Sequence, residues 1–216
     1  MGRLLKLYET MADSAKQHAE RVSFCAGIMA KYAMPDLQAE YGLSEDKLSE
    51  AVRVGGLYHD IGALYYKPFV LILDRDDMEQ TRVDMLRSHT ADGYKLIKKH
   101  NRFRFKKDKM YIRVIEDMAL YHHEWYDGSE SMYGLSGNKI PSAAGLCALA
   151  NKLDGLCETF FINGGNRFEF IAGLIESQSG RCYAPELLDW FVAAKDELAA
   201  FYATQDIKPT RKLQHA

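Results

Sequence analysis

The stretch Leu57-Tyr58-His59-Asp60-Ile61-Gly62 sets an imidazole and a carboxylate side by side at the end of an apolar run. Adjacent helical residues point about 100° apart, so both side chains could easily act together only on a central bound object. A divalent metal ion is such an object, because a neutral imidazole supplies a nitrogen ligand and a carboxylate can bridge two ions. The pair alone also fits a buried histidine that is hydrogen-bonded to a carboxylate.

The composition is that of an ordinary globular domain: 216 residues, 47% hydrophobic and 27% charged. A formal net charge of -2 gives no field that would attract a nucleic acid polymer or an anionic membrane. No apolar stretch approaches the length of a membrane span, and the first residues lack the apolar block of a secretory signal. The sequence therefore predicts a cytoplasmic protein. Its four cysteines form no Cys-X-X-Cys pair, which predicts reduced thiols in the core.

Apolar residues recur with the helical period along most of the chain, and no useful stretch alternates with period two. The pattern predicts a single all-α domain, a bundle of about seven helices within residues 1–204, followed by a polar tail at 205–216. After a short lead-in helix, the expected helices are 13–32, 45–60, 78–99, 109–122, 142–160, 167–177 and 185–204. Met34-Pro35-Asp36 is expected to break the first of these, and 63–77 to form a loop with a short helix.

Four or five of these helices each bring a metal-capable residue to an apolar face. The residues are His18, His59 with Asp60, His89, His122 with His123, and Asp154, with Asn151 one turn before Asp154. Burying five histidines and two carboxylates without a compensating cation would be costly. The set is too large for one tetrahedral zinc ion, and it fits two six-coordinate ions that share Asp60.

The order of these motifs resembles the HD superfamily of metal-dependent phosphohydrolases and, within it, the HD-GYP branch, whose members hydrolyse cyclic di-GMP. The resemblance covers roughly residues 14–195. It rests on His18-Ala19-Glu20-Arg21-Val22, His59-Asp60-Ile61-Gly62, His89 with Gly93, His122-His123-Glu124 with Asp127-Gly128-Ser129, and Gly134-Leu135 with Gly137. It implies an HD-type helical bundle and a metal-dependent phosphodiesterase.

The resemblance also implies roles for the site residues. Asp60 would be the catalytic residue and would bridge two divalent ions, iron or manganese rather than zinc, which activate a water. One ion would take His18, His59 and the Asn151/Asp154 region, and the other would take His89, His122 and His123. Lys67, Trp125, Tyr126 and Asp127 are expected to contact a nucleotide substrate, with core packing as the alternative for the aromatic rings.

Several positions depart from the branch pattern. Ala63 stands where the family has a lysine, Glu130-Ser131-Met132 where it has Gly-Tyr-Pro, and Asn151 where it has an aspartate. Ser14 stands where some members have a glutamate that binds a third metal ion. Metal binding is therefore expected to be better preserved than substrate recognition. A nucleotide-binding signalling module with little turnover, or a phosphohydrolase for another nucleotide, stays open as an alternative. A regulatory protein partner or a homodimer stays open as well.

Overall fold

The computed structural model describes residues 2–65, 78–100, 107–160 and 168–207, and within α5 it describes the side chains of 84 and 88–100. In these ranges the chain forms the α-helices α1 (Arg3–Tyr8), α2 (Asp13–Tyr32), α3 (Met34–Tyr41), α4 (Glu45–Tyr58), α5 (Met78–His100), α6 (Lys109–Tyr121), α7 (Ser142–Phe160), α8 (Phe168–Glu176) and α9 (Pro185–Ala203). Two 3₁₀ helices, η1 (Ile61–Tyr65) and η3 (Gly137–Lys139), complete the set. The described residues form no β-strand beyond one isolated bridge. The predicted all-α class is confirmed.

The helix α3 is absent from the sequence-based expectation. Pro35 ends α2 as expected, but it also lies in the first turn of the next helix. A proline is tolerated there because the first amide groups of a helix have no partner within the helix. Gly42 then ends α3 in the left-handed conformation, with φ of 63°.

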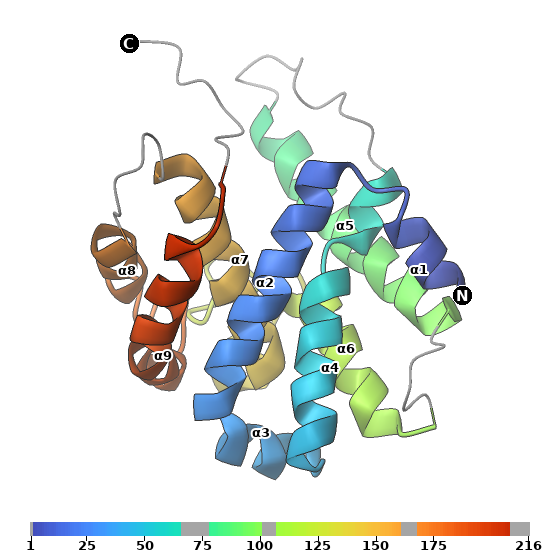
Figure 1. The fold of residues 1–216 in the computed structure, drawn as a ribbon. Coiled ribbons are helices and arrows are strands. Elements are labelled where there is room, and N and C mark those ends of the chain that lie inside the picture. The colour runs from blue at the N-terminus through green and yellow to red at the C-terminus, as the bar shows by residue number, and fades with distance from the viewer. Residues whose placement is uncertain (1, 66–77, 101–106, 161–167, 208–216) are drawn as a thin grey trace.

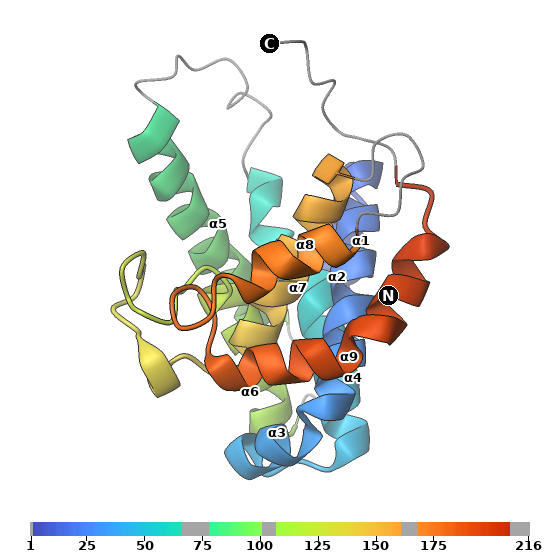
Figure 2. The ribbon, with the colours of Figure 1, turned by 90° about the vertical axis from the view of Figure 1, so that its left-hand side faces the viewer.

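The helix α2 lies at the centre of the bundle and packs beside α4, α7 and α9 (Figure 1). On the other side of α4, α6 packs against α4, α5 and α7. Figure 2 shows α8 and α9 on the side of the molecule next to α7. This packing buries one continuous apolar core, in which Met29, Ile115 and Phe191 are fully buried.

Two glycines set how closely the elements around His59 and Asp60 approach. A Cβ atom on Gly62 would lie 2.0 Å from the carbonyl oxygen of His89, so η1 packs directly on the backbone of α5. A Cβ atom on Gly56 would lie 2.7 Å from the Cα of Ser23, so α4 packs directly on α2. The end of α4 is thereby held between α2 and α5.

The cysteine prediction is confirmed, since all four thiols are free and three of them, Cys25, Cys147 and Cys157, are buried. Among the helices that the structure describes, none has the length and apolar character needed to cross a membrane.

Candidate metal centre

The predicted ligands come from five helices or their ends: His18 on α2, His59 and Asp60 at the end of α4, His89 on α5, His122 and His123 at the end of α6, and Asp154 on α7. The structure places all of them except Asp154 in two overlapping groups. Asp60, His89, His122 and His123 offer ligand atoms that all lie within 4.8 Å of one another, and so do His18, His59 and Asp60. Asp60 is common to both groups.

Asp60 lies at the centre of the cluster. Its Oδ1 is 3.1 Å from Nε2 of His89 and 3.4 Å from Nε2 of His122, and its Oδ2 is 3.4 Å from Nε2 of His59. The ring centroids of His59 and His122 are 5.0 Å apart, and those of His122 and His123 are 4.2 Å apart. One carboxylate therefore faces imidazoles from three directions.

The rings are oriented by hydrogen bonds on their outer nitrogens. Nδ1 of His59 donates to the carbonyl oxygen of Gly56 at 2.8 Å, and Nδ1 of His122 donates to that of Met118 at 2.9 Å. Because a carbonyl oxygen only accepts, the proton sits on Nδ1 and the lone pair of Nε2 points into the cluster. Such outer hydrogen bonds are the usual way in which proteins fix a histidine that binds a metal.

Two atoms at the centre indicate that the residues fit a cation. Nε2 of His59 and Oδ1 of Asp60 are buried and have no hydrogen-bond partner among the described residues, since their contacts of 3.1 to 3.4 Å lack hydrogen-bond geometry. Buried acceptors without partners are costly, and a divalent ion would satisfy Nε2 of His59 and Oδ1 of Asp60 together.

The protonation states suit metal binding. Burial, together with the nearby His59 and His89, lowers the pKa of His122 to about 4, although Asp60 opposes the shift. Burial and His122 hold the pKa of His123 well below its usual value. Burial alone would raise the pKa of Asp60, but His59 and the other imidazoles outweigh it and hold that pKa well below its usual range. At neutral pH the cluster therefore presents neutral imidazoles at His122 and His123 and an ionised carboxylate.

Two buried side chains at this centre were not expected from the sequence. The guanidinium of Arg21 lies against Asp154 and Glu158, and the hydroxyl of Tyr202 on α9 donates to Asp154. His18, Asp154 and Glu158 also offer ligand atoms within 4.8 Å of one another. Both of these carboxylates, however, are already paired with the guanidinium of Arg21. The sequence offered one indication that Arg21 belongs to this centre: it follows His18 by three residues, which puts both side chains on one face of α2.

Two further candidates are Asn151, a proposed ligand, and Lys67, a proposed substrate contact. Asn151 is half-buried on α7, one turn before Asp154. Lys67 lies outside the described residues.

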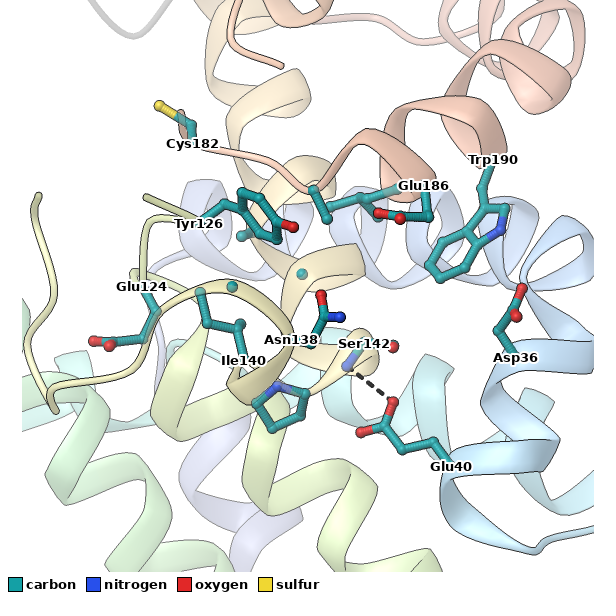
Figure 3. A pocket seen from close by; sticks show the side chains of 16 residues that line it. Asp36, Glu40, Glu124, Tyr126, Asn138, Ile140, Ser142, Cys182, Glu186 and Trp190 are labelled. Atoms are coloured by element: carbon teal, nitrogen blue, oxygen red, sulfur yellow. Dashed lines mark hydrogen bonds between the residues drawn. The ribbon is translucent and has the colours of Figure 1, made fainter. Parts of the chain in front are cut away.

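The other substrate candidates contact residues of their own loop and of the segment before α9, and their substrate role remains a prediction. The guanidinium carbon of Arg181 lies 4.9 Å from the ring centroid of Trp125, and Asp127 accepts from the backbone amide and the hydroxyl of Ser129. Tyr126 lines a cavity of about 270 Å³. Figure 3 shows its ring among Trp190, Glu186 and other residues of α3, α7 and α9, and none of the lining residues is a candidate metal ligand.

The loop that follows the paired histidines is organised by one buried carboxylate, Glu124. Its oxygens accept from the hydroxyl of Ser131 and from the backbone amides of Met132, Tyr133 and Leu135, at 2.5 to 3.2 Å. Tyr133 in turn lies 2.8 Å from the hydroxyl of Thr90, the neighbour of His89. The segment that departs from Gly-Tyr-Pro is thus held firmly beside the cluster.

Comparison with known proteins gives a consistent result. The family model of the HD domain matches residues 15–156. The chain is 25% identical over 194 residues to a cyclic di-GMP phosphodiesterase of Thermotoga maritima, covering 90% of this chain and 48% of that protein. It is also 25% identical over 213 residues to the cyclic di-GMP phosphodiesterase response regulator RpfG of Xanthomonas campestris, covering 97% of this chain and 52% of that protein.

A solved structure shares the fold. The HD domain of the L. monocytogenes phosphodiesterase PgpH, in complex with cyclic di-AMP, superposes with a TM-score of 0.54 at 19% identity, covering 93% of this chain and 96% of that one. The chain spans about half the length of the two phosphodiesterases that it matches in sequence.

Proposed function

Because the chain belongs to the HD domain family, we propose that it is a metal-dependent phosphodiesterase that hydrolyses a cyclic dinucleotide, with cyclic di-GMP as the leading candidate. The observation that carries the proposal is Asp60, which is shared by two histidine groups and has a buried oxygen without a hydrogen-bond partner. The substrate class is suggested by the two relatives described above, both of which are named as cyclic di-GMP phosphodiesterases.

The two groups would hold two divalent ions that share Asp60. His18 and His59 would serve one ion, with Asn151 as a further ligand suggested by the sequence. His89, His122 and His123 would serve the other. Mixed imidazole and carboxylate ligands around two ions that share Asp60 favour iron or manganese over zinc. When bound, such ions activate a water and neutralise the charge of a phosphodiester.

The chain's own residues prepare that chemistry. Gly56 and Met118 hold two imidazoles in the metal-binding tautomer before any ion arrives, so little reorganisation is needed on binding. Ala63 supplies no cationic side chain at the position where the family has a lysine. General acid–base groups typically contribute about 10²–10⁴-fold in rate, so we expect slow turnover.

The test is hydrolysis by the metal-loaded protein. Protein loaded with Mn²⁺ or Fe²⁺ is incubated with cyclic di-GMP, cyclic di-AMP and a chromogenic phosphodiester, and products are separated by chromatography. We expect metal-dependent formation of a linear dinucleotide from cyclic di-GMP, and none with Asp60→Ala.

Two other outcomes would assign a different function. Binding of the nucleotide without product would favour a signalling module, the function that Ala63 and Glu130-Ser131-Met132 also suit. Hydrolysis of another nucleotide but not of cyclic di-GMP would favour the third alternative, a phosphohydrolase with a different substrate.

A further inference from the structure

Asp154 is a fully buried carboxylate whose two oxygens are already saturated. Oδ1 accepts from Nε of Arg21 at 2.7 Å and from the hydroxyl of Tyr202 at 2.9 Å. Oδ2 accepts from Nη2 of Arg21 at 2.9 Å and lies 2.7 Å from Nδ1 of His18. Each carboxylate oxygen has about two lone-pair positions, so the four contacts leave none that faces a metal ion.

The contact with His18 has a defined direction. A carboxylate that takes two bonds from a guanidinium is an acceptor, so Nδ1 of His18 must donate to it. The lone pair of His18 is then on Nε2. His18 thus has the same arrangement as His59 and His122, whose Nδ1 atoms donate to backbone carbonyls.

We propose that Asp154 orients His18 and does not bind the metal ion, and that Arg21 and Tyr202 are the positioning residues that hold Asp154 in place. This role replaces the ligand role that the sequence suggested for Asp154. The inference rests on the metal-binding part of the proposed function. It also extends the metal centre to α9, because Tyr202 lies outside the residues 15–156 that match the HD family model.

Arg21 is suited to this role by its own surroundings. It is 9% exposed, and its guanidinium contacts two carboxylates, those of Asp154 and Glu158. The planar fork of the guanidinium fixes the plane of the Asp154 carboxylate, which a lysine could not do. Tyr202 is fully buried against Phe168, so its hydroxyl is held in place by the core.

Both roles of Asp154 predict a fall in metal affinity when Arg21 or Tyr202 is loosened, because outer partners support ligating carboxylates as well as ligating imidazoles. Only the orienting role requires the proton of His18 on Nδ1 and the metal on Nε2. If Asp154 orients His18, the loosening lets the imidazole rotate, and affinity falls. Loss of such an outer partner typically lowers metal affinity 10- to 100-fold.

The experiment measures Mn²⁺ affinity by titration calorimetry for the parent chain, Tyr202→Phe and Arg21→Lys. We expect about a 10-fold loss for Tyr202→Phe and about 10- to 100-fold for Arg21→Lys, in one of the two binding events. Tyr111→Phe is the matched control, because Tyr111 is also buried and its hydroxyl contacts a carboxylate, that of Glu50. These two residues lie toward the starts of α6 and α4, at the opposite ends of these helices from His122 and His59. Unchanged or higher affinity in both site variants, with the control like the parent, would overturn the inference.

A spectroscopic readout separates the two roles without any substitution. In Zn²⁺-loaded protein, ¹⁵N chemical shifts identify which nitrogen of His18 carries the proton and which binds the metal. We expect the proton on Nδ1 and the metal on Nε2, and a metal on Nδ1 would overturn the inference. Neither measurement uses a nucleotide. Metal binding without hydrolysis would therefore defeat only the proposed enzymatic function, whereas hydrolysis with unchanged affinity in Tyr202→Phe and Arg21→Lys would defeat only this inference.

Discussion

Asp60 is the side chain whose loss should affect metal binding most, because both histidine groups depend on it. Asp60→Ala removes the shared carboxylate and leaves five imidazoles facing one another. We expect the variant to lose both ions and to melt at the same temperature with and without added Mn²⁺. Elemental analysis and thermal melts with and without chelator provide the measurement.

The control for this prediction is Asp46→Ala, an exposed carboxylate in the first turn of the same helix. Its removal should cost only the interaction with the helix dipole, about 0.3–1 kcal/mol, and leave the metal content intact. If Asp60→Ala kept its metal and its metal-dependent rise in melting temperature, the shared-ligand role would be wrong.

The buried carboxylate of Asp117 should make the free energy of unfolding depend on pH, independently of the metal centre. Burial raises its pKa to about 6 against an ordinary 3.8, although Arg113 and the hydroxyl of Tyr41 oppose the rise. The folded state therefore binds a proton more tightly than the unfolded chain, and stability from this group falls as pH rises from about 4 to 6. Above that window the buried carboxylate stays costly, by up to about 3 kcal/mol.

Asp117→Asn removes this cost and can keep the bond from Tyr41. We expect the metal-free variant to melt several degrees higher than the parent at pH 7.5, with the advantage vanishing near pH 4. Thermal melts across that range in the presence of chelator would measure it. An advantage that is the same at both pH values would show that the carboxylate is not the cause.

Among the elements, the loop that follows the paired histidines depends on a single carboxylate, that of Glu124. Glu124→Gln replaces one acceptor oxygen by an NH₂ group that faces other donors. Hydrogen bonds to a charged group contribute about 1.5–3 kcal/mol each, and a buried donor left without an acceptor costs more. We expect faster hydrogen exchange at the amides of Met132, Tyr133 and Leu135 and a lower melting temperature.

The matched control for this element is Glu130→Gln, an exposed glutamate on the same loop. Its exchange pattern should equal that of the parent. Equal exchange in Glu124→Gln and the parent would mean that the loop is held by contacts other than this carboxylate, such as the one between Tyr133 and Thr90.

At the scale of the whole molecule, the sequence predicted the parts of the site that depend on local periodicity. His18, His59, His89 and His122 lie on apolar helical faces, and such faces turn inward in any helical bundle. Arg21 was missed because a charged helical residue normally faces water, and its burial depends on Asp154 and Glu158, more than 130 residues away. Pairings of that separation leave no local pattern.

The path of the chain after the paired histidines could not be predicted from the sequence, and the substrate roles of Trp125 and Tyr126 remain predictions. Trp125 and Tyr126 follow His123 closely, but the backbone amides of Tyr126 and Asp127 donate to the carbonyls of Cys182 and Arg181. These bonds tie the chain after the histidines to the segment before α9. A turn that is fixed by a distant loop cannot be inferred from the residues that make it.

The last prediction concerns metal and folding together. The ligands come from helices that meet only in the native bundle, so ions bind the folded chain and not the unfolded one. A ligand whose free concentration is about 100 times its dissociation constant stabilises the folded state by about 2.7 kcal/mol. For a chain of this size, that raises the melting temperature by roughly 5–10 °C. We expect two ions per chain, since Ser14 offers no carboxylate for a third, and a rise of that order on adding Mn²⁺ to chelator-treated protein. Elemental analysis and differential scanning calorimetry measure both quantities, and one ion at saturation would refute the shared role of Asp60.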